Sequence, residues 1–172
     1  MFNSKIPKIK NKGFTLLEML IAVTVIAVGL IGVHTALARA VNQAIEVRKR
    51  FIAIYLGQEG IELIKNIRDG NWIEGVAWDD GLISCSSGCE TDNFDHPTLT
   101  SYAEKYFYID DADDFYKYID SPGAGDVKTL YQRKITITEP ETYKLDIKVE
   151  LFWKFNGEDK TIEVDQNIYK WR

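Results

Sequence analysis

Histidine is scarce in this chain of 172 residues, which has only His34 and His96. The two lie far apart in the sequence, and no nucleophile, metal-binding or phosphate-binding motif of recognised spacing is present. A catalytic site needs a nucleophile or base together with a group that orients it, and the sequence offers no such set. We therefore expect a protein that is not an enzyme, with no catalytic residue, no cofactor and no metal.

Cysteine is equally scarce, because Cys85 and Cys89 are the only two and both lie in the short polar stretch SCSSGC. This pair cannot link distant parts of the fold. Three intervening residues, including Gly88, let the two sulfur atoms meet, so we expect a disulfide in a peripheral loop outside the cytoplasm. Metal binding with His96 as a third ligand, or two free thiols, are the alternatives.

Basic residues are fewer than acidic ones, and the net charge is −5. The first 13 residues are an exception, since they hold no acidic residue and contain Lys5, Lys8, Lys10 and Lys12. The rest of the chain is therefore more acidic than the total suggests. Because binding to nucleic acid needs clustered lysine and arginine, no specific nucleic acid is expected as a partner.

Proline is absent between Pro7 and Pro97, so no strong helix breaker occurs in that stretch. An apolar run begins at Phe14 and carries no formal charge from Met19 to Ala38. At about 1.5 Å per residue this run spans the ~30 Å hydrocarbon core of a membrane. The lysines before it and the acidic region after it predict that the N-terminus is cytoplasmic and the C-terminal domain lies outside.

Beyond Ala38 the chain becomes polar but keeps an apolar stripe at helical spacing. Gly60 falls in the same stripe, whose apolar members are Ile45, Ile52, Leu56, Leu63 and Ile67. We predict a transmembrane helix over 14–38 that continues as an amphipathic helix over 39–70. The sequence RDGN at 68–71 is expected to end this helix, with Gly70 as a left-handed cap.

The C-terminal part, 131–172, alternates between apolar and polar residues with period two. The segments 131–138, 142–154 and 160–172 predict a three-stranded antiparallel meander whose apolar face covers the helix. The turn FNGED joins the last two strands, and Pro140 lies outside the ladder. Residues expected on the inner face are Tyr131, Arg133, Ile135, Ile137, Tyr143, Leu145, Ile147, Val149, Leu151 and Trp153, with Trp171 at one end of the core.

Residues 71–130 form a variable, loop-rich region that is rich in aromatic side chains. Short strands are predicted near 105–109 and 115–119. The run Asp110–Asp114 carries four aspartates but lacks the ligand spacing of a known calcium loop. A solvated acidic loop is the simpler interpretation, and calcium binding is the alternative.

Glu18 interrupts the apolar run, and a carboxylate inside a spanning helix costs roughly 2.5–3.5 kcal/mol unless it finds a partner. In a plain anchor such a residue should be selected against. Before any assembly, we expect Glu18 to have at best the N-terminal amine of its own chain and interfacial water. A cut between Gly13 and Phe14 would create that amine close by.

The segment KGFTLLEMLIAVTVIAVGLIGV, residues 12–33, closely resembles the N-termini of type IV prepilins and type II secretion pseudopilins. In that family a prepilin peptidase removes a basic leader ending in Gly and methylates the new N-terminal Phe. A Glu four residues after the Phe then pairs with the amine of a neighbouring subunit. The resemblance implies a leader over 1–13, cleavage between Gly13 and Phe14, N-methylation of Phe14 and inter-subunit pairing by Glu18.

The stretch LGQEGIELIKNIRDGNW, residues 56–72, looks more like minor pilins and I-type pseudopilins than like major pilins. The implied fold is α+β, with a long N-terminal helix packed on a C-terminal antiparallel sheet of three or more strands. Many major pilins carry a proline in the middle of the apolar helix. This chain has only Gly29 and Gly32 as weak points there, and both suit close helix packing.

The function implied is that of a structural subunit, a minor pilin, which is inserted in the bacterial cytoplasmic membrane and then assembled into a filament at the cell surface. Its partners would be other pilin subunits, the prepilin peptidase, the inner-membrane assembly platform and, before assembly, membrane lipid. A type II secretion pseudopilin is the nearest alternative. The alternative from another class is a monomeric, membrane-anchored binding protein whose 71–130 region holds a ligand.

Overall fold

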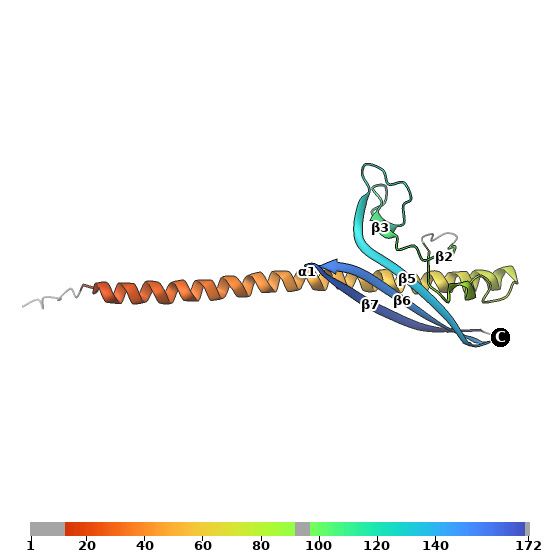
Figure 1. Cartoon of the computed structure of the whole chain (residues 1–172), viewed down its shortest axis with the longest axis horizontal. Helices are drawn as coiled ribbons and strands as arrows, with labels where there is room; N and C mark the ends of the chain where they lie inside the picture. Colours follow the sequence, from red (N-terminus) through yellow and green to blue (C-terminus); the bar gives the residue numbers. More distant parts are fainter. Residues whose placement is uncertain (1–12, 92–96, 171–172) are drawn as a thin grey trace, which may run out of the picture. The chain divides into compact units, whose positions relative to one another are not determined.

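The computed structural model describes residues 13–91 and 97–170. The chain divides into two compact units, Met1–Ile45 and Glu46–Arg172. The predictions that concern the leader lysines, His96 and Trp171 fall outside the described residues. The predicted α+β class is confirmed, with one long helix followed by a curled antiparallel sheet (Figure 1).

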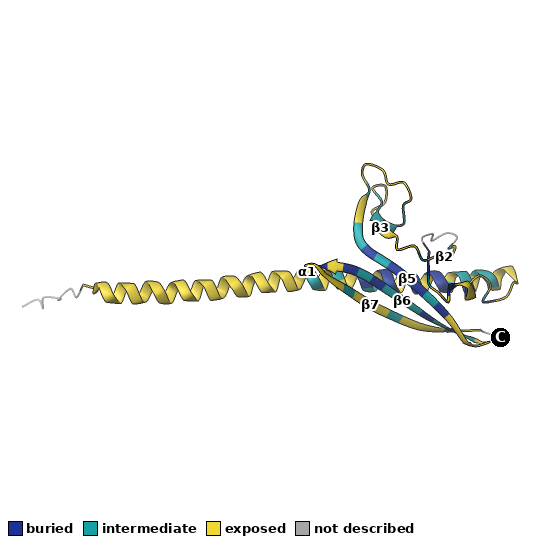
Figure 2. Ribbon diagram, in the orientation of Figure 1, coloured by how far each residue is buried: buried dark blue, intermediate teal, exposed yellow. Residues whose placement is uncertain are grey.

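Helix α1 runs from Leu16 to Glu74 and contributes to both units. In the first unit every described residue is exposed, although most side chains there are large and apolar (Figure 2). By length and composition, α1 is able to cross a membrane. The apolar surface of the first unit therefore requires a cover that this chain alone does not provide.

The C-terminus of α1 lies four residues beyond the last residue of the predicted helix, 39–70, because Gly75 rather than Gly70 supplies the left-handed turn. Gly75 has φ +75°, whereas Gly70 sits inside the helix. The amide of Gly75 donates to the Trp72 carbonyl at 3.3 Å, and that of Val76 donates to the Asn71 carbonyl at 3.0 Å. These two bonds make a Schellman motif, which satisfies the last helical carbonyls.

The second unit contains a seven-stranded antiparallel sheet whose three long strands are the last in the sequence (Figure 1). Strand β5 pairs with β6 along one edge, and along its other edge with both β1 and β3. Strand β7 pairs only with β6, and the short strands β2 and β4 extend β1 and β3. The strands are β1 (Cys89–Glu90), β2 (Thr100–Ser101), β3 (Tyr106–Ile109), β4 (Tyr116–Lys117), β5 (Val127–Glu141), β6 (Lys144–Phe155) and β7 (Glu158–Tyr169).

The predicted meander is confirmed as β5, β6 and β7, and Asn156 and Gly157 form its second turn with φ of +52° and +82°. Strand β5 begins four residues before the predicted start, because its first residues pair with β3. Pro140 lies within β5 where the register shifts between Thr138 and Glu141, so it has no partner in the ladder. Tyr143 was predicted to face the core but is exposed, because it occupies the turn between β5 and β6.

The predicted strands near 105–109 and 115–119 are present as β3 and β4. Strands β1 and β2 were not predicted, since two residues each are too few for an alternating pattern. The short 3-10 helix η1, Ile83–Cys85, was not predicted either.

The core of the second unit lies between α1 and the inner face of the sheet. Of the predicted helical stripe, Leu56, Gly60 and Leu63 are buried, while Ile45 is exposed. The predicted alternation holds along the sheet, because the inner side chains of β5 and β6 are buried and their neighbours are more accessible. The buried members of this core on β5 and β6 are Tyr131, Arg133, Ile135, Ile137, Leu145, Ile147, Val149, Leu151, Trp153 and Phe155.

Arg133 is fully buried at the centre of this core. Its Nη1 donates to the Leu56 carbonyl of α1 at 2.8 Å, and its Nη2 donates to the Thr91 carbonyl after β1 at 2.8 Å. Nη1 also lies 3.3 Å from the Glu59 carboxylate, and the guanidinium covers the Phe107 ring at 4.9 Å. One side chain thus joins the helix, β3, β5 and the segment that follows β1.

Two glycines of α1 allow the helix to approach the sheet closely. A Cβ at Gly57 would lie 2.8 Å from Val164 Cγ2 and 3.2 Å from Leu151 Cδ2. A Cβ at Gly60 would lie 3.1 Å from Arg133 Cδ and 3.2 Å from Val149 Cγ1. Because Gly60 has no side chain, the Arg133 guanidinium can pass over it and reach the Leu56 carbonyl.

We expect Gly57→Leu to lower the free energy of unfolding by about 1–3 kcal/mol, because the added side chain has to displace β6 and β7. The matched control is Gly70→Ala, since Gly70 is also helical but a Cβ there meets nothing within 4 Å. That control should stabilise the chain by roughly 0.5–1 kcal/mol. Urea unfolding of the full chain in detergent, followed by tryptophan fluorescence, measures both; equal effects of the two changes would contradict the close approach.

Candidate functional site at the start of helix α1

The first turn of α1 is closed by a reciprocal pair of hydrogen bonds between Thr15 and Glu18. The backbone amide of Thr15 donates to Glu18 Oε2 at 2.9 Å, and the amide of Glu18 donates to Thr15 Oγ1 at 3.2 Å. The Thr15 hydroxyl also donates to the same carboxylate oxygen at 3.0 Å. This is a capping box, with Thr15 as the N-cap residue.

The prediction that Glu18 has only its own terminal amine and water before assembly is therefore wrong, because Thr15 provides two donors within the same chain. The pattern T-x-x-E was present in the sequence and is the known signature of this cap. One carboxylate oxygen, Oε2, accepts both bonds. The other oxygen accepts no hydrogen bond from any described residue, so the cap leaves the carboxylate able to take a further donor.

The predicted cleavage residues, Gly13 and Phe14, lie in non-helical backbone directly before this cap. Phe14 is 86% exposed, and nothing lies within 4 Å of the position where a Cβ of Gly13 would be. Neither residue is held by contacts with the described part of the chain beyond its neighbours. The peptide bond between Gly13 and Phe14 is thus followed by backbone that is neither helix nor strand up to Thr15.

The threonine hydroxyls of the apolar run are satisfied within the helix itself. Thr24 Oγ1 donates to the Ile21 carbonyl at 2.8 Å, and Thr35 Oγ1 donates to the Gly32 carbonyl at 2.9 Å. The helix continues through Gly29 and Gly32, and a Cβ at either would meet nothing within 4 Å in this chain. An apolar helix without unsatisfied hydroxyl groups is suited to lipid and to the interior of a helical assembly.

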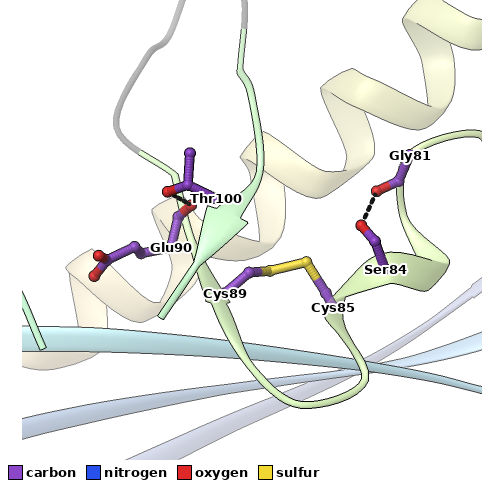
Figure 3. Close-up of a disulfide and its surroundings, with 6 residues drawn as sticks. All are labelled: Gly81, Ser84, Cys85, Cys89, Glu90 and Thr100. Atoms are coloured by element: carbon purple, nitrogen blue, oxygen red, sulfur yellow. Dashed lines mark hydrogen bonds between the residues drawn. A yellow bond between two sulfur atoms is a disulfide. The ribbon is translucent and has the colours of Figure 1, made fainter. Parts of the chain in front are cut away.

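The predicted disulfide between Cys85 and Cys89 is present, with 5.3 Å between the two Cα atoms (Figure 3). Its placement in a peripheral loop was wrong. Both cysteines are buried in the core of the second unit, and Cys89 pairs with Ile135 of the central strand. The bridge therefore closes the turn from η1 into β1 against the sheet, where the Thr91 carbonyl also accepts the Arg133 bond.

The acidic run Asp110–Asp114 forms the tip between β3 and β4. Lys117 contacts Asp110 Oδ2 at 2.7 Å and Asp113 Oδ2 at 2.5 Å. The hydrogen bond to Lys117 lowers the pKa of the Asp110 carboxyl, and the same contact raises the pKa of Lys117. The other oxygens of Asp110 and Asp113 accept the amides of Ala112 and Phe115. These carboxylates thus shape a turn.

Within residues 13–91 and 97–170, no group of three or more histidine, cysteine, aspartate or glutamate side chains is arranged to hold a metal ion. The two cysteines are both used in the disulfide. The residues to which the sequence resemblance assigns roles thus lie at the start of α1, whereas the features of the second unit described above support the fold.

Comparison with known proteins identifies one family model. The prokaryotic N-terminal methylation motif matches residues 8–33, which include Gly13, Phe14 and Glu18. No curated protein and no solved structure matches the chain. The matched residues end inside the apolar half of α1, and the layout of a long N-terminal helix with an antiparallel sheet agrees with them. The N-terminal segment of this chain therefore carries the methylation signal of type IV pilins and pseudopilins.

Proposed function

We propose that this protein is a structural subunit of a type IV pilus-like filament. The observation that carries the proposal is the methylation motif at residues 8–33, continued by an apolar helix that the chain itself leaves exposed. The prepilin peptidase cuts between Gly13 and Phe14 and methylates Phe14. The helix holds the subunit in the cytoplasmic membrane with its N-terminus inside, until the assembly platform transfers it to the extracytoplasmic filament.

Within this class we propose a minor pilin, on the likeness of residues 56–72 to minor pilins. A secretion pseudopilin uses the same helix and the same processing, so the neighbouring genes separate the two. A retraction ATPase beside a major pilin favours the pilus, and a secretion channel with its ATPase favours the pseudopilin. A monomeric anchored protein differs from both, because it would stay in the membrane after shear.

The test of processing is the N-terminus of the protein isolated from a strain with an active prepilin peptidase. Intact-mass and peptide mass spectrometry should find Phe14 as the first residue, carrying an added methyl group. Gly13→Val should block this, because a branched side chain crowds the bond to be cut. The control is Gly29→Val, a change in the exposed helix that follows and away from the bond, which should be processed normally. A wild-type chain that still begins with Met1 in that strain would rule out the proposal.

A further inference from the structure

A groove of about 600 Å³ lies on the face of the sheet that is turned away from α1. Its floor is a row of paired residues across four strands, Tyr106, Gln132, Phe152 and Thr161. Gln132 and Phe152 alternate along their strands with the buried residues of the core, which places them on the outer face. Two aromatic rings are thus accessible on the outer face of the sheet.

The groove is bordered by two lysines that form no ion pair with any described residue. Lys128 Nζ lies 4.1 Å from the centre of the Tyr106 ring, and Lys134 Nζ lies 5.6 Å from that of Tyr102. Lys154 of β6 also lines the groove, and its Nζ is paired with the Asp159 carboxylate at 3.3 Å. In a chain of net charge −5, the groove therefore places two lysines that have no ion pair among the described residues beside aromatic surface.

The surroundings of the groove favour a short acidic segment over a long polyanion. The next row on the same face contains Lys134 itself, with Glu150 opposite it on β6 and Glu163 opposite Glu150 on β7. Glu104 and Asp159 also line the groove. A nucleic acid or an acidic polysaccharide would have to cross these carboxylates, which repel it. A compact ligand with one or two carboxylates and an apolar side chain avoids them.

The tip between β3 and β4 has this composition. Phe115 is 66% exposed, and Asp111 and Asp114 are exposed carboxylates outside the ion pairs of the described residues. The tip is held in one conformation by Lys117 and by the bond from the Asp110 amide to the Phe115 carbonyl at 3.0 Å. A pre-organised loop that carries an exposed aromatic residue loses little conformational entropy on binding.

The tip cannot bring Phe115 onto Phe152 of its own copy without breaking the sheet. Ile109, directly before the tip, is paired with Val127 at the start of β5, whereas Phe152 on the groove floor is paired with Gln132. At about 3.4 Å per residue, these two positions on β5 lie roughly 17 Å apart. The occupant therefore has to come from another molecule.

We propose that the groove of one copy binds the β3–β4 tip of a second copy, with Phe115 against Phe152 and Tyr106 and with Asp114 beside Lys128. The inference rests on the proposed function, since a filament is what brings two copies side by side. The contact is heterologous, so each copy keeps an open tip on one side and an open groove on the other, as a helical assembly requires. Two adjacent copies suffice, which suits a subunit of low abundance.

The test is disulfide trapping between two full-length versions that are co-produced in the native host, one with Phe115→Cys and one with Thr161→Cys. Mild oxidation of membranes and sheared filaments should give a dimer that contains one of each version and that reducing agent dissolves. The control replaces Thr161→Cys by Tyr143→Cys, an exposed position in the turn before β6, whereas Thr161 of β7 pairs with Phe152 near the other end of β6. The native cysteines do not interfere, because they are buried and already paired.

Charge variants test the contact in the same assay. Lys128→Glu, or Asp114→Lys on the other copy, should lower the yield of the mixed dimer at least several-fold, and the two together should restore most of it. Equal yields for the Thr161→Cys and Tyr143→Cys pairs, or adducts with another protein only, would overturn the inference. Retention on a polyanionic resin that depends on Lys128, without a mixed dimer, would overturn it too.

Recovery of the subunit in sheared filaments is measured in the same samples and reports on the proposed function alone. If the subunit enters filaments but gives no mixed dimer, the proposed function is supported and the proposed contact is ruled out. If the subunit is found only in membranes, the proposed function is ruled out. If the mixed dimer is also missing from those membranes, the proposed contact is ruled out as well.

Discussion

Glu18→Gln is expected to be inserted and cleaved like the wild-type chain and yet to be nearly absent from sheared filaments. We propose that the Glu18 carboxylate pairs in the filament with the Phe14 amine of an adjacent subunit. Deep in an apolar interior, an amine or a carboxylate without its partner costs roughly 2.5–3.5 kcal/mol. Because about 1.4 kcal/mol corresponds to a factor of ten, incorporation should fall by at least tenfold.

Glutamine is the informative substitution, because the capping box between Thr15 and Glu18 accepts either glutamate or glutamine at this position. Glu18→Gln keeps the cap and removes the charge, whereas Glu18→Leu removes both. If pairing with an amine is what matters, the two variants should fail to the same degree, and Glu18→Asp, which is shorter, should be intermediate at best. If the cap matters most, only Glu18→Leu should fail.

The measurement is the ratio of subunit in sheared filaments to subunit in membranes, for each variant beside the wild type. Processing at Phe14 is checked in the same samples, so that a defect in cleavage is not mistaken for a defect in assembly. A normal ratio for both Glu18→Gln and Glu18→Leu would show that Glu18 does not control assembly.

Arg133→Met is expected to lower the free energy of unfolding of the second unit by about 1–3 kcal/mol. Methionine fills much of the same space, and replacing a buried charge by an apolar group of similar size is often tolerated. Here the Thr91 carbonyl loses the only donor that it has among the described residues, and the Glu59 carboxylate loses its partner. The loss of stability arises because these acceptors are left without their donor.

Arg133→Lys is the companion variant, since it retains the charge but cannot donate to the Leu56 and Thr91 carbonyls at once. It should be destabilised to a similar degree. Urea midpoints with unchanged slopes measure the stability, and amide hydrogen exchange around residues 89–91 shows whether that segment loosens first. A stability equal to that of the wild type for both variants would contradict the bridging role of Arg133.

The elements of this fold that follow a strong period could be predicted, and those that depend on single contacts could not. The alternation along Leu145–Trp153 predicts β6 and its inner face, because only a half-buried strand requires that pattern. The apolar run and its glycine-phenylalanine junction likewise predict the N-terminal helix. Strands β1 and β2 have no pattern of their own; β1 forms where β5 offers it an edge, and β2 pairs in turn with β1.

The end of α1 shows why local signals were insufficient. Gly70 and Gly75 both follow polar residues, and either can adopt a left-handed conformation. The choice of Gly75 depends on contacts such as the bonds from the Asn71 side chain to the Trp78 and Asp80 carbonyls, which sequence periodicity does not reveal. The position of Arg133 depends in the same way on the bare helix surface at Gly60.

The candidate site was predictable to a different degree at each residue. Gly13, Phe14 and Glu18 follow from the motif, although their cleavage, methylation and pairing stay predictions. The bond between Glu18 and Thr15 could be predicted from the pattern T-x-x-E, which is the signature of a capping box. The groove over Tyr106 and Phe152 joins strands that are distant in sequence, so no linear pattern indicates it.

Under the proposed processing, the capping box at Thr15 should also make the chain a better substrate. A peptidase has to draw the chain out into an extended form before it can cut, and helical backbone resists this because its hydrogen bonds must first be broken. Since the box fixes the first helical residue at Leu16, Gly13 and Phe14 stay outside the helix. A peptidase that cuts here would therefore bind the junction without unwinding the membrane segment, and we expect the helix to be complete when the processed chain is released.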